Sequence, residues 1–502
     1  MAAPSLSTIP PEVVHHICSH MEASSLSRTR LVNHYLGNVA TSWLFWKVEI
    51  NTNSYRQCLA FTKIAQSAKL SPLVRQVVCT TCVPMSMSDF PHLDDGFYAE
   101  LRNLRRLDVC TIANIMSTLP FIACFRNLRN LEVSFRDLLE PEVPPHVNLD
   151  NISFESGFIE LTLQCLAGTW SLQRQKVIDE ALWQETHAEY SCSQILPSTS
   201  GPIALKVFKL REMNEELDPR VAESAEFKTI IGSGTLVDLS LHKERYTSIG
   251  GRGPITASSR HQIERFERLP KVWFIPDVAK NLQALSLTFG HSWGWHPKVN
   301  LETISPSFPN LRDLTLGKFI FNHERQAEWI ASLGKSNRSG GLERLCLHTC
   351  RILYVATHVG YPNEENMMAI PPPHAAELCT HFPLRWYTVF EKWQQSMPAL
   401  TLFQLNDCTD GEDYILNSGP RPKRDILGYA TFRQNDETKY HTIPKNHVGV
   451  PYGEAAFALR LEQLKTNPPI PVGPCVVRDE QATTRFCSLV KSRKESAMAQ
   501  QR

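Results

Sequence analysis

The sequence predicts an α/β fold in which a short helical domain precedes a solenoid with a parallel sheet on its concave face. Two observations predict it. The first fifty residues place apolar side chains at helical spacing between helix-starting signals, and a short apolar pattern then recurs along most of the chain. We therefore divide the 502 residues into a helical domain (1–50), a solenoid (51–405) and a C-terminal extension (406–502).

The helical domain is predicted to contain three short helices. Ser7 or Thr8 can cap the first helix, and Pro10 suits its opening turn, where no amide partner is lost. Ser24 restarts the chain into a second helix, and a third is expected to run to Trp46. A unit of about forty residues buries a low fraction of its surface, so part of this apolar surface should meet something else.

The helical domain carries an ordered set of landmarks, namely Ile9-Pro10-x-Glu12, Ile17, Leu26, Arg30-Leu31-Val32 and Trp43-x-x-Trp46. In this order the segment resembles an F-box, with Ile9 where the family usually has Leu and Asn33 where Cys or a basic residue is common. In that family the segment docks a Skp-type adaptor, which connects it to a cullin-RING ubiquitin ligase. The alternative is an ordinary helical start that packs on the following domain.

The resemblance implies which residues would contact the Skp-type adaptor. They lie before and along the first helix, around the second helix and at the end of the third. They are Leu6, Ile9, Pro10, Glu12, Val13, Ile17, Leu26, Leu31, Val32, Trp43 and Trp46.

The repeated pattern consists of an apolar residue, a second one three positions later and a third two positions beyond that. Because the second and third members are two apart, they point to the same face of a strand, which we interpret as the core face. Successive first members are 21 to 58 residues apart, and the wider steps imply insertions or unrecognised copies. The ten copies are Val74-Val77-Cys79, Leu104-Leu107-Val109, Leu128-Leu131-Val133, Leu149-Ile152-Phe154, Leu205-Phe208-Leu210, Leu236-Leu239-Leu241, Leu282-Leu285-Leu287, Leu311-Leu314-Leu316, Leu342-Leu345-Leu347 and Leu400-Phe403-Leu405.

These copies resemble the irregular leucine-rich repeats that commonly follow an F-box. Asparagine precedes the first member in five copies, as at Asn127 and Asn310, and asparagine tolerates the turns that redirect a chain into a strand. The resemblance implies parallel strands with helices or loops returning on the convex side. Helices are expected over 54–68, 111–125, 324–333 (closed by Gly334) and 384–395.

Two insertions interrupt the predicted solenoid, near 164–200 and 242–270. The first is predicted to hold a helix through Val177 and Trp183, and the second to form a long surface loop. Beyond residue 406, Pro-rich pieces alternate with short strand-like runs. The last fifteen residues are polar and are expected to be disordered.

Between the core positions of each predicted strand lie polar side chains that should face the concave surface, the usual binding face of a solenoid. Both signs of charge are present, which favours a mixed polar protein surface over a polyanion as the ligand. The alternative is a solvated face without a partner. The candidate substrate-binding residues are Arg106, Asp108, Asn130, Glu132, Lys209, Asp238, Asp313, Thr315, Arg344 and Gln404.

Composition narrows the function classes. Lys and Arg number 52 against 51 acidic residues, so no basic footprint points to nucleic acid or to an anionic membrane surface. No stretch approaches about 18 uninterrupted apolar residues and the start lacks a signal-peptide pattern, so an intracellular protein of the cytoplasm or nucleus is expected. The fourteen cysteines are mostly found in apolar strand-like runs, which indicates reduced core residues.

No pattern in the sequence predicts catalysis, a cofactor or a metal. The Cys79-Thr-Thr-Cys82 run has metal-like spacing but no second pair, and Cys346-Leu-His348-Thr-Cys350 lies on a strand whose Leu347 must point inward. We therefore expect a non-enzymatic substrate-recognition subunit of a cullin-RING ligase. The alternatives are a scaffold that delivers no substrate for ubiquitination and an enzyme whose site lies within 406–502.

Overall fold

In the described residues the protein is α/β, with parallel strands alternating with helices, which confirms the predicted class. The chain divides into two compact units, Met1–Leu236 and Val237–Arg502, and each is described by itself. The structure is a computed structural model that describes residues 9–83, 106–137, 154–186, 201–213, 217–243, 268–295, 308–359, 377–406, 428–433, 439–443 and 472–500.

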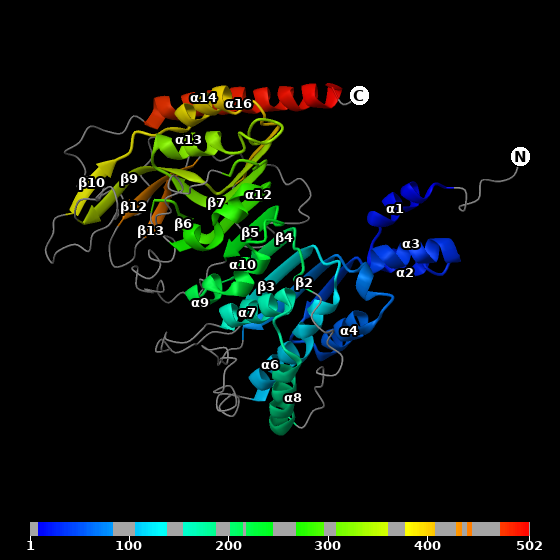
Figure 1. Cartoon of the computed structure of the whole chain (residues 1–502). Helices are drawn as coiled ribbons and strands as arrows, with labels where there is room; N and C mark the ends of the chain where they lie inside the picture. Colours follow the sequence, from blue (N-terminus) through cyan, green and yellow to red (C-terminus); the bar gives the residue numbers. More distant parts are fainter. Residues whose placement is uncertain are drawn as a thin grey trace, which may run out of the picture. The chain divides into compact units, whose positions relative to one another are not determined.

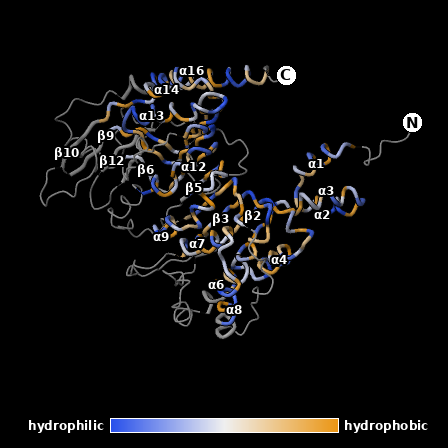
Figure 2. The backbone as a smooth tube through the Cα atoms, in the orientation of Figure 1, coloured by the Kyte–Doolittle hydropathy of each residue, from blue (hydrophilic) through white to orange (hydrophobic). Residues whose placement is uncertain are grey.

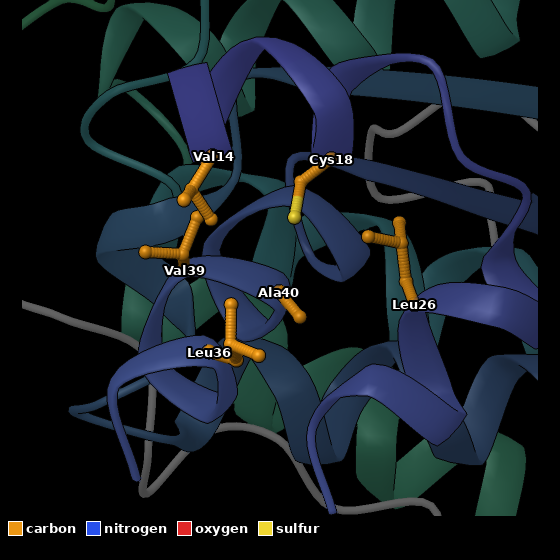
Figure 3. Close-up of a cluster of buried hydrophobic side chains, with 6 residues drawn as sticks. All are labelled: Val14, Cys18, Leu26, Leu36, Val39 and Ala40. Atoms are coloured by element: carbon orange, nitrogen blue, oxygen red, sulfur yellow. The ribbon is translucent and has the colours of Figure 1, made fainter. Parts of the chain in front are cut away.

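The first unit begins with the three predicted helices, α1 (Pro11–Ser19), α2 (Ala23–Thr29) and α3 (His34–Leu44). Pro11 occupies the first turn of α1, and the Asn33 side chain caps α3 by accepting a hydrogen bond from the Leu36 amide at 2.8 Å. We call residues 9–46 the helical bundle. It encloses a core of its own, drawn in Figure 3 and formed by Val14, Cys18, Leu26, Leu36, Val39 and Ala40.

Four parallel strands follow the helical bundle in the first unit (Figure 1), each paired with the next. The core members of the repeat lie directly opposite each other, so Val77 pairs with Leu131, which pairs with Phe208. All three are buried, as the predicted core face requires. The strands are β1 (Lys47–Asn51), β2 (Gln76–Val83), β3 (Asn130–Asp137) and β4 (Val207–Arg211).

Helices fill the connections between these strands. The helix expected over 54–68 is α4, and the one expected through Val177 and Trp183 is α8. Helix α7 is buried on nearly every side, and the buried residues include the polar Glu155, Ser156 and Thr162. The helices are α4 (Tyr55–Gln66), η2 (Ser71–Leu73), α6 (Arg106–Thr118), η3 (Leu119–Cys124), α7 (Phe154–Ala167), α8 (Leu172–Thr186), α9 (Pro219–Glu223) and α10 (Ala225–Ile230).

The second unit repeats the same arrangement with five parallel strands. Leu239, Leu285, Leu314 and Leu345 occupy matching positions on successive strands and are all buried. Figure 2 shows hydrophobic residues along β5 and β6. In spatial order the strands are β5 (Asp238–Lys243), β6 (Ala284–Trp293), β7 (Asp313–Phe321), β8 (Arg344–His348) and β11 (Leu402–Asn406).

Strand β7 also starts a second branch of the sheet. Lys318 adopts φ 56°, and the three residues beyond it, Phe319, Ile320 and Phe321, are all buried. The last residues of β7 then pair in parallel with β9 (Arg351–Val359), which pairs with β12 (Gly428–Arg433). Two antiparallel strands complete this branch, β10 (Glu377–His381) on β9 and β13 (Lys439–Ile443) on β12.

Two of the helices expected in the second unit are present. Helix α13 (Glu324–Ser332) is followed by Gly334 at φ +69°, and α14 (Trp386–Ser396) buries Trp386, Phe390 and Trp393. Both confirm the helical spacing of their apolar residues. A short helix, α12 (Pro276–Asn281), precedes β6.

The C-terminal helix α16 (Val472–Gln500) corrects the prediction of a disordered polar tail. It lies beside α14 (Figure 1) and presents Ala482, Phe486 and Val490, four residues apart, to the core. At the start of α14, the Asp479 carboxylate of α16 accepts a hydrogen bond from the Tyr387 amide at 2.8 Å. At the end of α14, Arg493 of α16 donates hydrogen bonds to backbone carbonyls. The negative charge of Asp479 and the positive charge of Arg493 therefore complement the dipole of α14.

A backbone hydrogen-bond pattern recurs at the start of the strands. The carbonyl oxygen of the residue that precedes one strand accepts hydrogen bonds from two successive backbone amides at the start of the neighbouring strand. These are the amide of the residue that precedes the neighbouring strand and the amide of that strand's first residue. The Arg75 oxygen accepts from the Arg129 and Asn130 amides at 2.8 and 3.0 Å, and the same pairing begins β6, β7, β8 and β11. Asn127 and Asn310 donate from their side chains to carbonyls of the preceding connection, Pro72 and Lys280, at 2.8 Å. The asparagines therefore tie successive repeats together.

The same pattern identifies a strand that we did not predict. The Trp46 carbonyl accepts from the Arg75 and Gln76 amides, and β1 follows directly with Val48 and Ile50 buried. Phe45, Val48 and Ile50 fit the repeated spacing of three and then two residues. The sheet therefore begins immediately after the helical bundle.

Two predicted repeat copies are wrong. Leu107 and Val109 lie in α6, and Phe154 lies at the start of α7, so neither copy forms a strand there. Arg106 and Asp108 therefore sit on a helix and not on the strand face to which we assigned them. A spacing of three residues occurs in helices as well as in this pattern, which explains the error. The rest of the second copy, 149–153, and most of the predicted loop over 242–270 lie outside the described residues.

Candidate functional site

Helix α1 carries two apolar stripes on different sides. Val14 and Cys18, one helical turn apart, point into the core of the helical bundle. Val13 and Ile17 have the same spacing but are 46% and 50% exposed. Since Val14 and Cys18 already fill the core, the Val13 and Ile17 side chains remain open to solvent.

A second exposed apolar pair lies at the turn between α2 and α3. Leu31 is 86% exposed and Val32 is 59% exposed. The turn is fixed from both sides, because the Arg30 guanidinium stacks over the Phe45 ring at 5.6 Å and Gly37 lets α3 approach the Arg30 carbonyl closely. The exposed pair therefore sits on an ordered part of the backbone.

Leu26, a predicted adaptor-binding residue, is buried. It is 4% exposed and belongs to the core of the helical bundle. Substituting it would disturb the fold of α2 and not a contact surface. Packing in the core of the helical bundle explains why residue 26 is apolar.

The remaining predicted adaptor-binding residues fall into three groups. Pro10 and Glu12 are exposed at the start of α1, and Ile9 is partly buried against the core of the helical bundle. Trp43 packs on the same core and donates its Nε1 hydrogen to His15 Nδ1 at 3.1 Å, which fastens α3 to α1. Trp46 is half-buried and its carbonyl begins the strand pattern. Leu6 lies outside the described residues.

In the first unit, an ion pair across neighbouring strands joins the predicted residue Glu132 to Arg211, which lies outside the predicted set. Arg211 Nε on β4 lies 2.9 Å from Glu132 Oε1 on β3, with both side chains largely buried. Ser134, two residues along β3, donates to Glu212 Oε2 at 2.8 Å. Asn130 is half-buried at the start of β3. Glu132 thus already has a charged partner within the protein.

In the second unit, the polar positions of three neighbouring strands also pair. Arg344 on β8 donates two hydrogen bonds to the Asp313 carboxylate on β7, which raises the pKa of Arg344. Cys346 Sγ donates to Gln404 Oε1 on β11 at 3.5 Å, and it is also hydrogen-bonded to Thr315. Asp238 is half-buried on β5. The strand face is therefore a pre-arranged polar surface with both signs of charge.

The buried thiols of Cys58 and Cys350 are poor nucleophiles. Burial raises the pKa of Cys58 to about 11 and that of Cys350 to about 12, so both stay protonated near neutrality. Burial also raises the pKa of Cys79 and Cys346 and lowers the pKa of His348. Among the described residues, no three or more His, Cys, Asp or Glu side chains gather in a way that could hold a metal ion.

Comparison with known proteins adds no identification. No family model matches the chain, and no curated protein matches it. None of the helices in the described ranges combines the length and the hydropathy that crossing a bilayer requires.

Proposed function

We propose that this protein is the substrate-recognition subunit of a cullin-RING ubiquitin ligase, in which the helical bundle binds a Skp-type adaptor. The proposal rests on the F-box-like landmarks of residues 9–46 together with one structural observation. The bundle fills its own core and still leaves four aliphatic side chains open, those of Val13, Ile17, Leu31 and Val32. Ordered apolar side chains that are exposed on a small helical unit favour a protein interface.

The rest of the chain suits the presentation of a second protein. The polar strand positions in both units carry acidic and basic groups that are held in place by neighbours, as with Glu132 and Arg211. Because these side chains are already ordered, they lose little conformational entropy when a protein surface binds them. Asn130, Glu132, Asp238, Asp313, Thr315 and Arg344 remain our candidates for substrate contact.

Such a subunit acts by proximity. Holding a substrate lysine close to the thioester of the conjugating enzyme raises its effective concentration, and the chemistry belongs to that enzyme. This chain would supply only two surfaces, one on the helical bundle and one on the strands. No catalytic side chain of its own is needed.

The proposal predicts that Val13→Asp with Ile17→Asp abolishes capture of a Skp-type adaptor. Both side chains are exposed, so the variant should fold, but each charge would be buried unpaired at the interface. Loss of two anchoring residues worth about 2 kcal/mol each reduces affinity by roughly a thousandfold. The measurement is co-purification of the tagged chain with recombinant adaptor, followed by titration.

The matched control is Leu172→Asp with Val177→Asp on α8, where two apolar side chains are similarly exposed. This control should bind the adaptor as the wild type does. Equal binding by both double variants, or no binding by the wild type, would overturn the proposal. Adaptor binding without recruitment of a cullin would favour the scaffold alternative.

A further inference from the structure

The helical bundle contains four histidines, and their ring nitrogens are used differently. His15 Nδ1 accepts from Trp43 Nε1 at 3.1 Å, and His34 Nδ1 lies 3.3 Å from Asn38 Nδ2. His16 and His20 are both exposed, and their ring nitrogens have no hydrogen-bond partner within the described part of the chain. His15 and His34 thus have hydrogen-bond partners within the bundle, and His16 and His20 have none among the described residues.

His16 and His20 are four residues apart at the end of α1, so they lie on the same side of the helix. Their ring centroids are 4.8 Å apart in an edge-to-face contact. Two imidazole nitrogens bound to one zinc ion at about 2.0–2.1 Å each lie at most about 4.2 Å apart. Chelation therefore requires the side chains to rotate from the edge-to-face arrangement until one nitrogen of each ring reaches the same ion.

The backbone under this pair is held in place. His20 is the C-terminal capping residue of α1, and its amide donates to the Ile17 carbonyl at 3.1 Å. The Ser19 hydroxyl donates to the His16 carbonyl at 2.6 Å. Both histidines therefore project from an ordered last turn, which lowers the entropy that chelation would cost.

We propose that His16 and His20 together bind a divalent transition-metal ion. Neutral imidazole is a common ligand for zinc, nickel and copper, whereas magnesium prefers oxygen. Two ligands fall short of the three or four of a closed structural or catalytic zinc site, so the remaining positions stay open to water or to a partner's side chain. The site adjoins the exposed Val13 and Ile17 on α1, but it does not depend on adaptor binding.

The test is calorimetric titration of the full chain with zinc chloride, under reducing conditions and with magnesium chloride as the negative ion. Wild type, His16→Gln, His20→Gln and His34→Gln are compared, because the chain also contains fourteen cysteines that can bind zinc. Chelation predicts that either single substitution in the pair weakens the site by at least about tenfold, since one imidazole cannot replace two. His34→Gln should leave it unchanged.

The inference is overturned if either single variant keeps wild-type zinc affinity, which would indicate independent imidazoles. It is also overturned if all four proteins bind the same number of zinc ions with the same affinities. Far-UV circular dichroism establishes that each variant is folded.

Discussion

Replacing Phe486 with alanine is expected to destabilise the second unit by about 3–5 kcal/mol, because a fully buried aromatic ring is lost and a cavity remains. Phe486 is 0% exposed in α16, and its ring lies 5.2 Å from Phe390 and 5.0 Å from Phe403. It therefore joins α16 to both α14 and the last strand of the five, β11. The measurement is guanidinium chloride unfolding of the full chain followed by tryptophan fluorescence, since Trp393 lies 6.2 Å from Phe486.

The matched control is Val477→Ala, which shortens an apolar side chain on the solvent side of the same helix. This change should alter the unfolding free energy by less than about 0.5 kcal/mol. Equal effects of the two substitutions would show that α16 does not pack on α14. Helix α16 covers α14 and β11, the last of the five strands.

Gly334→Ala is the second substitution with a large expected effect. Gly334 follows α13 at φ +69°, where side chains are strained, and an added Cβ would collide with the Leu311 carbonyl oxygen. Strain and collision together should cost about 3 kcal/mol or more, because the obstacle is backbone and cannot rotate away. The same unfolding measurement gives the loss in free energy.

Gly340→Ala separates the cost of the backbone conformation from the cost of the collision. Gly340 has nearly the same backbone conformation, φ +72°, but an added Cβ would meet nothing within 4 Å. This variant should lose only about 1 kcal/mol, the cost of the conformation alone. If Gly334→Ala were no worse than Gly340→Ala, close packing at the end of α13 would be ruled out as the reason for glycine there.

The strands were predictable because their core positions obey one spacing. Eight of the ten predicted copies provide core residues to a parallel strand, and in each of these copies the second member is the residue that aligns across neighbours, as Leu314 aligns with Leu345. The failures have local causes. The copy at Leu107 is a helix because the three-residue step also suits a helix, and β1 was hidden because its residues had been assigned to the helical domain.

Helix α16 was missed for a different reason. Its buried stripe is narrow, with Ala482, Phe486 and Val490 set among charged residues, and the overall polarity of the tail dominated the interpretation. The four-residue steps between these three positions were the available signal. The buried Asp479 becomes understandable only with the tertiary fold, because its partner is the Tyr387 amide 92 residues away.

The candidate site was predictable in outline and not in detail. The sequence indicates that Val13, Val14, Ile17 and Cys18 are apolar on a helix, but only packing against α3 decides which pair faces the core. The same packing buries Leu26, which the resemblance predicts to bind the adaptor. The pairing of Asp313 with Arg344 required the strand register, which depends on residues far apart in the sequence.

In the proposed complex, the helical bundle binds the adaptor while the strand face stays free for a substrate. Hydrogen–deuterium exchange of the full chain, with and without a saturating Skp-type adaptor, tests it directly. We expect slower exchange of backbone amides within residues 11–32 and unchanged exchange in β3, β4, β7 and β8. Protection confined to those strands, or no protection in the bundle at saturation, would contradict it.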